Sequence, residues 1–325
     1  MTATLSSLQT LDYKISESVL LEGGNSLSNI NIRYSTFGEL NADKSNVVWV
    51  FHALTGSSNP LEWWAGLFGE ESAFDIERDY VICANMLGSC YGTTSPEDRS
   101  FPVFTIRDIV SLHQKLRDHL EIEKIRIGIG GSMGGQQLLE WASQEPDLFE
   151  HIVPIATNAC HSPWAIAFNE VQRMALENLD KGKGLETARA IAMLSYRHYR
   201  TFDHTQKDID QRWDNFRSST YLRHQGEKLR RRFTTESYYY LSKAMDSHNL
   251  SRHSVSLEAA LSNINASATV IGVDSDLLFP IEEQQFIAQH LKAATFHQID
   301  SSFGHDGFLI ETSQLNKILR EQLPT

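Results

Sequence analysis

The stretch that decides the fold is Ile125–Trp141, which reads IRIGIGGSMGGQQLLEW. A short β-branched run leads into a cluster of glycines, and a helical pattern follows at once. The cluster contains Gly-x-Ser-x-Gly, with Gly130, Ser132 and Gly134 at its fixed positions. On a very tight turn from strand to helix, a serine is strained and its hydroxyl projects, while the glycines avoid a clash between the two elements. The spacing therefore predicts a nucleophilic serine on such a turn.

The alternative is a glycine-rich turn with an incidental serine, because Gly and Ser are common residues. The strand and the helix both lie on the correct side of the serine, and Gly128, Gly131 and Gly135 crowd the turn further. The helix would point its positive end at the site, which makes the backbone N–H of Met133 a candidate oxyanion donor. A functional serine also requires an acid and a histidine further along the chain, in that order.

The amino-acid composition limits the classes of protein to which this chain can belong. The 325 residues, with 41% hydrophobic and 22% charged residues, fit one large α/β domain that carries an inserted cap. A formal net charge of -12 argues against nucleic acid or an anionic membrane as partner. Three cysteines without metal-type spacing predict neither a disulfide framework nor a metal site. Met1–Asp12 is polar, with no apolar core of a secretory signal, so we expect a cytoplasmic protein.

Strand and helix patterns alternate along most of the chain. Tyr13–Gly38 alternates around Gly23 and Gly24 and predicts a β-hairpin, and Phe101–Leu120 has helical spacing. Continuous apolar runs predict buried strands at Asn46–Phe51, Tyr80–Met86, His151–Ala156, Ala268–Val273 and Ala294–Ile299. This order predicts a mostly parallel sheet with helices on both faces.

The pattern changes between Cys160 and His253, where no clear strand is found. Helical spacing instead covers Asn169–Asn178, Gly184–Tyr199 and Arg217–Met245. We therefore expect a core domain of residues 1–159 and 254–325, and a helical lid of residues 160–253 inserted over the site.

Polar residues follow several predicted strands, at the sheet edge where α/β proteins place their chemistry. Asp274 and Asp276 follow one strand and His305 follows the last, so that with Ser132 the chain order is Ser, Asp, His, as in α/β-hydrolases. Ser132 would attack an acyl carbonyl, His305 would move its proton, and either aspartate would orient the imidazole.

A loop upstream of the serine completes the predicted oxyanion hole. His52–Gly56 follows a buried strand, which is where this kind of fold supplies its second oxyanion N–H, here that of Leu54. His52 itself is interpreted as a structural histidine at a strand end.

The sequence resembles the homoserine O-acetyltransferase family, acyltransferases of the α/β-hydrolase fold. The resemblance covers most of the chain, and its motifs together are far more specific than Gly-x-Ser-x-Gly. The matching stretches are His52–Gly56, Asn85–Gly88, Cys90–Gly92, Phe101–Val103, Thr105–Asp108, Gly130–Gly135, Leu139–Trp141, Ser275–Asp276, Leu278–Pro280 and Gly304–Leu309.

The resemblance implies a role for individual residues. It makes Ser132 the nucleophile, Asp276 rather than Asp274 the acid, and His305 the base. The segment Gly184–Arg197 resembles the family's lid helix, which implies that Arg189 and its partner Asp306 hold the amino-acid substrate. A zwitterion needs a cation for its carboxylate and an anion for its ammonium group.

The implied reaction is acetyl transfer from acetyl-CoA to L-homoserine by a ping-pong mechanism, at the start of methionine biosynthesis. Acetyl-CoA is a co-substrate, no cofactor is bound permanently, and the resemblance implies a homodimer with lid helices at its interface. The alternatives are succinyl-CoA as donor, L-serine as acceptor, a plain esterase and, last, a non-enzymatic binding protein with a damaged triad.

Overall fold

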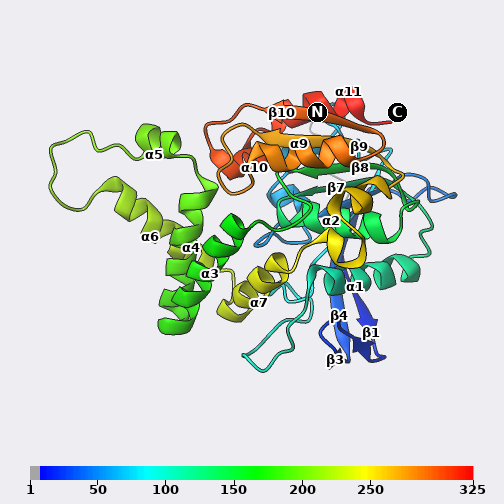
Figure 1. Cartoon of the computed structure of the whole chain (residues 1–325), viewed down its shortest axis with the longest axis horizontal. Helices are drawn as coiled ribbons and strands as arrows, with labels where there is room; N and C mark the ends of the chain where they lie inside the picture. Colours follow the sequence, from blue (N-terminus) through cyan, green and yellow to red (C-terminus); the bar gives the residue numbers. More distant parts are fainter. Residues whose placement is uncertain (1–7, 325) are drawn as a thin grey trace.

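An eight-stranded sheet forms the centre of the protein (Figure 1). The structure is a computed structural model and describes residues 8–324; the prediction made from Met1–Asp12 lies partly outside that range. The strand order is β1-β4-β6-β5-β7-β8-β9-β10. The strands are β1 (Gln9–Ile15), β4 (Ile30–Phe37), β5 (Val47–Phe51), β6 (Tyr80–Ala84), β7 (Ile125–Gly131), β8 (Phe149–Ile155), β9 (Ser267–Val273) and β10 (Ala294–Ile299).

The sheet is antiparallel only at the edge that the N-terminal strands form. β1 pairs antiparallel with β4, and β4 pairs antiparallel with β6. Every pairing from β6 to β10 is parallel. The predicted hairpin connects β1 to β4, with β2 (Val19–Leu20) and β3 (Ser26–Leu27) paired near its tip. The predicted fold class, a mostly parallel sheet in an α/β protein, is confirmed.

Helices cover both faces of the sheet. Those of the core are α1 (Ile106–His119), α2 (Met133–Gln144), α8 (Leu257–Ser262), α9 (Ile281–His290), α10 (Gly307–Ile310) and α11 (Thr312–Gln322). Short 3-10 turns are η1 (Pro60–Glu62), η2 (Ala65–Leu67), η3 (Leu250–His253) and η4 (Gly304–Asp306).

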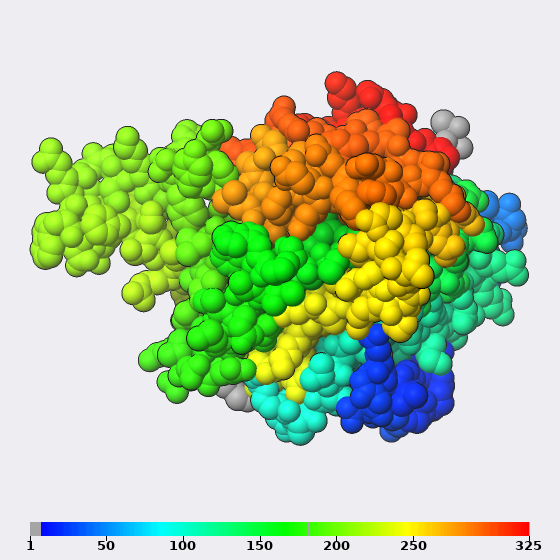
Figure 2. Space-filling view, viewed as in Figure 1, coloured from blue at the N-terminus to red at the C-terminus, as the bar shows by residue number. Residues whose placement is uncertain are grey.

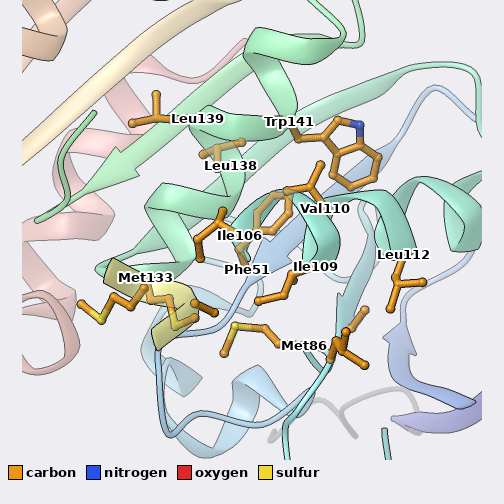
Figure 3. Packing of buried hydrophobic residues seen from close by; sticks show 14 of the residues in the cluster. Phe51, Met86, Ile106, Ile109, Val110, Leu112, Met133, Leu138, Leu139 and Trp141 are labelled. Atoms are coloured by element: carbon orange, nitrogen blue, oxygen red, sulfur yellow. The ribbon is translucent and has the colours of Figure 1, made fainter. Parts of the chain in front are cut away.

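Two apolar cores result, one on each face. Successive residues of a strand point to opposite faces, so Phe51 of β5 lies in one core and Val50 in the other. In the first core Phe51 packs with Ile109 of α1 and Trp141 of α2 (Figure 3). In the second, Leu315 of α11 packs against the sheet. The sheet is thus buried on both faces, as its apolar strands predict.

The segment between β8 and β9 is helical, as predicted. It contains α3 (Pro163–Asn178), α4 (Lys181–Tyr196), α5 (Tyr199–Thr205), α6 (Arg217–Arg230) and α7 (Thr235–Asp246). α5, α6 and the chain between them project from the body at the left of Figures 1 and 2. Buried residues of α4, α6 and α7 nevertheless belong to the first core, among them Leu185, Leu229 and Tyr238. The exact division into core and lid therefore stays a prediction.

Several predicted boundaries were wrong for local reasons. α1 begins at Ile106 rather than near Phe101, because Thr105 and Asp108 form a capping box there. α3 begins at Pro163, six residues before the predicted start, with Ser162 as its N-cap. The single helix predicted for Arg217–Met245 is two helices, since Thr234 caps the start of α7. Among the helices of residues 8–324, none is long and apolar enough to cross a membrane.

Candidate active site

Ser132 occupies the predicted turn between β7 and α2. Its φ of 57° and ψ of -127° lie outside the regions that L-residues favour. A Cβ on Gly134 would come within 2.2 Å of the backbone oxygen of Phe51, and one on Gly130 within 2.5 Å of the backbone of Gly134. Glycine at both positions lets α2 approach the sheet closely enough to hold the strained serine.

A continuous hydrogen-bonded chain connects Ser132, His305 and Asp276, which are all buried. Nε2 of His305 lies 2.9 Å from the Oγ of Ser132, and Nδ1 lies 2.6 Å from Oδ2 of Asp276. With the proton on Nδ1 donated to Asp276, Nε2 is free to accept the serine hydroxyl proton. The geometry is that of a nucleophile, a base and a group that orients the base.

The structure also separates the two candidate aspartates. The Oδ1 of Asp276 accepts the N–H groups of Leu278 and Phe279, at 2.8 and 2.9 Å, which fixes its carboxylate beside His305. Oδ1 of Asp274 instead accepts the N–H of Ser301 at 2.9 Å. Only Asp276 contacts the imidazole.

Aromatic rings surround the imidazole of His305. Phe279 stacks on it, with ring centroids 5.0 Å apart and planes at 26°. Phe308 and Tyr196 lie with their ring centroids at 5.2 and 5.7 Å. These rings pack against the imidazole and restrict its orientation.

The predicted oxyanion donors belong to the start of α2 and to the loop after β5. Met133 is the first residue of α2, and Leu54 is a buried residue of the loop that follows β5. Within residues 8–324, neither backbone N–H has a hydrogen-bond acceptor. Two free N–H groups at a helix start and an adjacent loop are the arrangement that stabilises an oxyanion.

His52 holds the loop that carries Leu54. It is fully buried, its Nδ1 donates to the oxygen of Ala53 at 2.9 Å, and its Nε2 accepts the N–H of Met86 at 3.2 Å. Burial lowers the pKa of this imidazole from 6.5 to about 4, so the ring is neutral near pH 7. This agrees with the interpretation of His52 as a structural histidine.

Asp306, which is predicted to share the substrate with Arg189, forms an ion pair with another residue of the lid. Nε of Arg197 lies 2.8 Å from Oδ2 of Asp306. The guanidinium of Arg189 lies 5.3 Å above the ring of Tyr196, and no ion pair of Arg189 occurs in the part of the chain that the structure describes. Arg197 was not predicted, because its contact with Asp306 joins two distant segments and leaves no pattern in the sequence.

No metal centre is found across the described residues 8–324, where no group of three or more His, Cys, Asp or Glu side chains is arranged to hold an ion.

Comparison with known protein families agrees with this geometry. The family model of the alpha/beta hydrolase fold matches residues 46–312. An esterase of known crystal structure superposes with a TM-score of 0.90 over 98% of this chain and 100% of its own, at 22% identity, a level that supports the fold alone.

Relatives with higher sequence identity to this chain are named for a specific activity. Homoserine O-acetyltransferase of Cyclobacterium marinum is 48% identical over 323 residues, which cover 94% of this chain and 92% of that protein. The crystal structure of homoserine O-acetyltransferase from Staphylococcus aureus is 27% identical, with a TM-score of 0.87 over 98% of this chain and 96% of its own.

Proposed function

The chain belongs to the homoserine O-acetyltransferase family of the alpha/beta hydrolase fold, and we propose that it acetylates the γ-hydroxyl of L-homoserine with acetyl-CoA, at the start of methionine biosynthesis. The observation that carries the proposal is the chain of contacts from Ser132 through His305 to Asp276. Similarity to the named relatives supports the choice of substrate.

The first half-reaction acylates the serine. Ser132 Oγ attacks the thioester carbonyl of acetyl-CoA, and its proton passes to Nε2 of His305. The N–H groups of Leu54 and Met133 stabilise the tetrahedral oxyanion. The carbon–sulfur bond breaks, the imidazolium returns the proton to the sulfur, and coenzyme A leaves an acetyl ester on Ser132.

The second half-reaction discharges the ester. The carboxylate of homoserine binds Arg189 and its ammonium group binds Asp306. Nε2 of His305 removes the proton of the γ-hydroxyl as its oxygen attacks the acetyl carbonyl. The imidazolium then protonates Ser132 Oγ, so that O-acetylhomoserine leaves and the free serine is restored. The rings around His305 limit the access of water to the acetyl ester.

Two alternatives use the same residues. Succinyl-CoA could replace the donor or L-serine the acceptor, and an esterase would pass the acyl group to water. Incubation of the protein with each donor and each acceptor, followed by mass analysis of the products, separates them. We expect O-acetylhomoserine to form fastest by at least about tenfold. Rapid release of free acetate without an acceptor would contradict the proposal in favour of an esterase.

We further propose a cytoplasmic homodimer that associates through the lid. α3 exposes Trp164, Val171 and Met174 along one side, and the chain between α5 and α6 exposes Ile209 and Trp213 by 92% and 89%. An exposed apolar surface of this kind is typical of an interface. Light scattering should give twice the chain mass, and Trp213→Ser should shift the protein toward the monomer, whereas a monomeric wild type would contradict this proposal.

A further inference from the structure

The contact between Arg197 and Asp306 joins the lid to the residue that follows His305. Both side chains are largely buried, with 20% and 13% of their surface exposed. The 2.8 Å contact is an ion pair rather than a linear hydrogen bond, because Nε of Arg197 has no hydrogen-bond partner of suitable angle in the described chain. Charge therefore dominates this contact.

The backbone around this ion pair is fixed by close packing. Gly304 has a φ of +65°, and a Cβ there would lie 2.7 Å from the backbone nitrogen of His198. The hydroxyl of Thr201 in α5 donates a hydrogen bond to the oxygen of Ser302. The corner between α4 and α5 is thus anchored on the loop that carries His305.

The carboxylate of Asp306 contacts Arg197 through Oδ2. Its other oxygen, Oδ1, has no hydrogen-bond partner within residues 8–324. Oδ1 is also not fully enclosed by the protein. A second cation can therefore approach Oδ1 while Arg197 stays in place.

A site for a zwitterion contains a cation and an anion that can neutralise one another. Tyr196 connects the two groups, because its ring lies 5.3 Å from the guanidinium of Arg189 and 5.7 Å from the imidazole of His305, which directly precedes Asp306. The ammonium group of the substrate requires the carboxylate of Asp306 in one fixed orientation, whereas the substrate's own carboxylate requires only Arg189. Arg197 is the ion-pair partner of Asp306, and the ring of Tyr196 lies against the guanidinium of Arg189.

We propose that Arg197 is a positioning residue, which binds Oδ2 of Asp306 and so holds the carboxylate with Oδ1 available for the ammonium group of the acceptor. The inference rests on the proposed function, because it assigns Asp306 to the acceptor. It predicts a defect confined to the second half-reaction and to acceptors that carry an ammonium group.

The test measures the two half-reactions separately. Rapid-quench mass analysis follows acetylation of Ser132 by acetyl-CoA, and then its discharge by homoserine or by 4-hydroxybutanoate, which lacks the ammonium group. For Arg197→Gln we expect acetylation within about twofold of wild type and a KM for homoserine at least about tenfold higher. Discharge by 4-hydroxybutanoate should be unchanged.

Two further variants sharpen the test. Arg197→Lys should restore the KM to within about threefold, because the contacting atom is Nε and a lysine ammonium reaches at least as far from the backbone. Arg200→Gln is the matched control, since Arg200 lies exposed on the same lid corner, and it should leave both half-reactions unchanged.

An unchanged homoserine KM in Arg197→Gln would overturn the inference. Equal losses in both half-reactions, or with both acceptors, would also overturn it, because they would mean a purely structural role. A lysine variant as impaired as the glutamine variant would overturn it as well. If acetylated wild type is not discharged by homoserine, the proposed function fails instead, and the two failures are distinguishable.

Discussion

Ser132 Oγ lies 2.9 Å from Nε2 of His305, although 173 residues separate the two along the chain. The contact forms because parallel strands end at one edge of the sheet, where β7 leads into the serine turn and β10 into the loop of His305. The loop after β9 supplies Asp276 at the same edge. Topology thus assembles three residues that share no local sequence.

Asp276→Asn should lower kcat for acetyl transfer by about 10⁴-fold, because an amide in place of the carboxylate favours the wrong tautomer of His305. Asp274→Asn is the matched control, two residues away on the same loop, and should retain most of the activity, since Asp274 bonds Ser301 and not the imidazole. Steady-state kinetics of both variants measure the difference. Equal losses in the two would contradict the assignment.

Gly134→Ala should destabilise the protein by about 3 kcal/mol or more, because its new methyl group would meet the backbone of Phe51, which cannot move aside. Gly182→Ala is the control: in α4 the methyl group would meet only the flexible side chain of Arg230, and alanine favours the helix by up to about 1 kcal/mol. Urea unfolding of both variants gives the free energies. A small cost at Gly134 would mean that the strand and helix can separate.

His113→Phe should reduce the loss of stability in acid. His113 is buried between Trp49 and Trp141, and burial lowers its pKa from 6.5 to about 3. The unfolded chain binds a proton below pH 6.5 and the folded protein does not until about pH 3, so stability is lost as pH falls through this window.

Lowering the pH from 7 to 5 should therefore reduce the free energy of unfolding of the wild type by about 2 kcal/mol through this histidine. The phenylalanine variant should not show this loss. Urea unfolding at the two pH values measures the cost. His224→Phe, at an exposed site on α6, should leave the pH dependence of wild type almost unchanged. Identical pH profiles for wild type and His113→Phe would refute a buried neutral imidazole.

Arg189→Gln should raise the KM for homoserine by about tenfold or more, because the acceptor carboxylate loses its charged partner. Acetylation of Ser132 by acetyl-CoA should be unaffected. Lys183→Gln, exposed on the same helix, serves as the control and should leave the KM unchanged. A normal homoserine KM in Arg189→Gln would exclude Arg189 from the acceptor site.

The sequence allowed prediction of those parts of the site that lie at strand ends. Gly-x-Ser-x-Gly, the loop aspartates and His305 each stand next to a readable strand, and β7 and β10 formed where expected. The break between α6 and α7 and the early start of α3 were missed because capping residues outweighed the helical period.

Arg197 could not be found in the same way. Its contact with Asp306 depends on the close approach of the lid corner to Gly304, which is a tertiary fit between distant segments and leaves no periodic signal in either of them. The choice of Asp276 over Asp274 came from the resemblance alone, and its physical reason lies in the turn geometry that bonds Asp276 to Leu278 and Phe279.

The central claim is that Ser132 carries the acyl group, and the intact mass of the protein after mixing with acetyl-CoA tests it most directly. Wild type should gain the mass of one acetyl group, which homoserine then removes, whereas Ser132→Ala should gain none. Absence of the adduct from wild type with both acetyl-CoA and succinyl-CoA, or its presence on Ser132→Ala, would contradict acyl transfer through this serine.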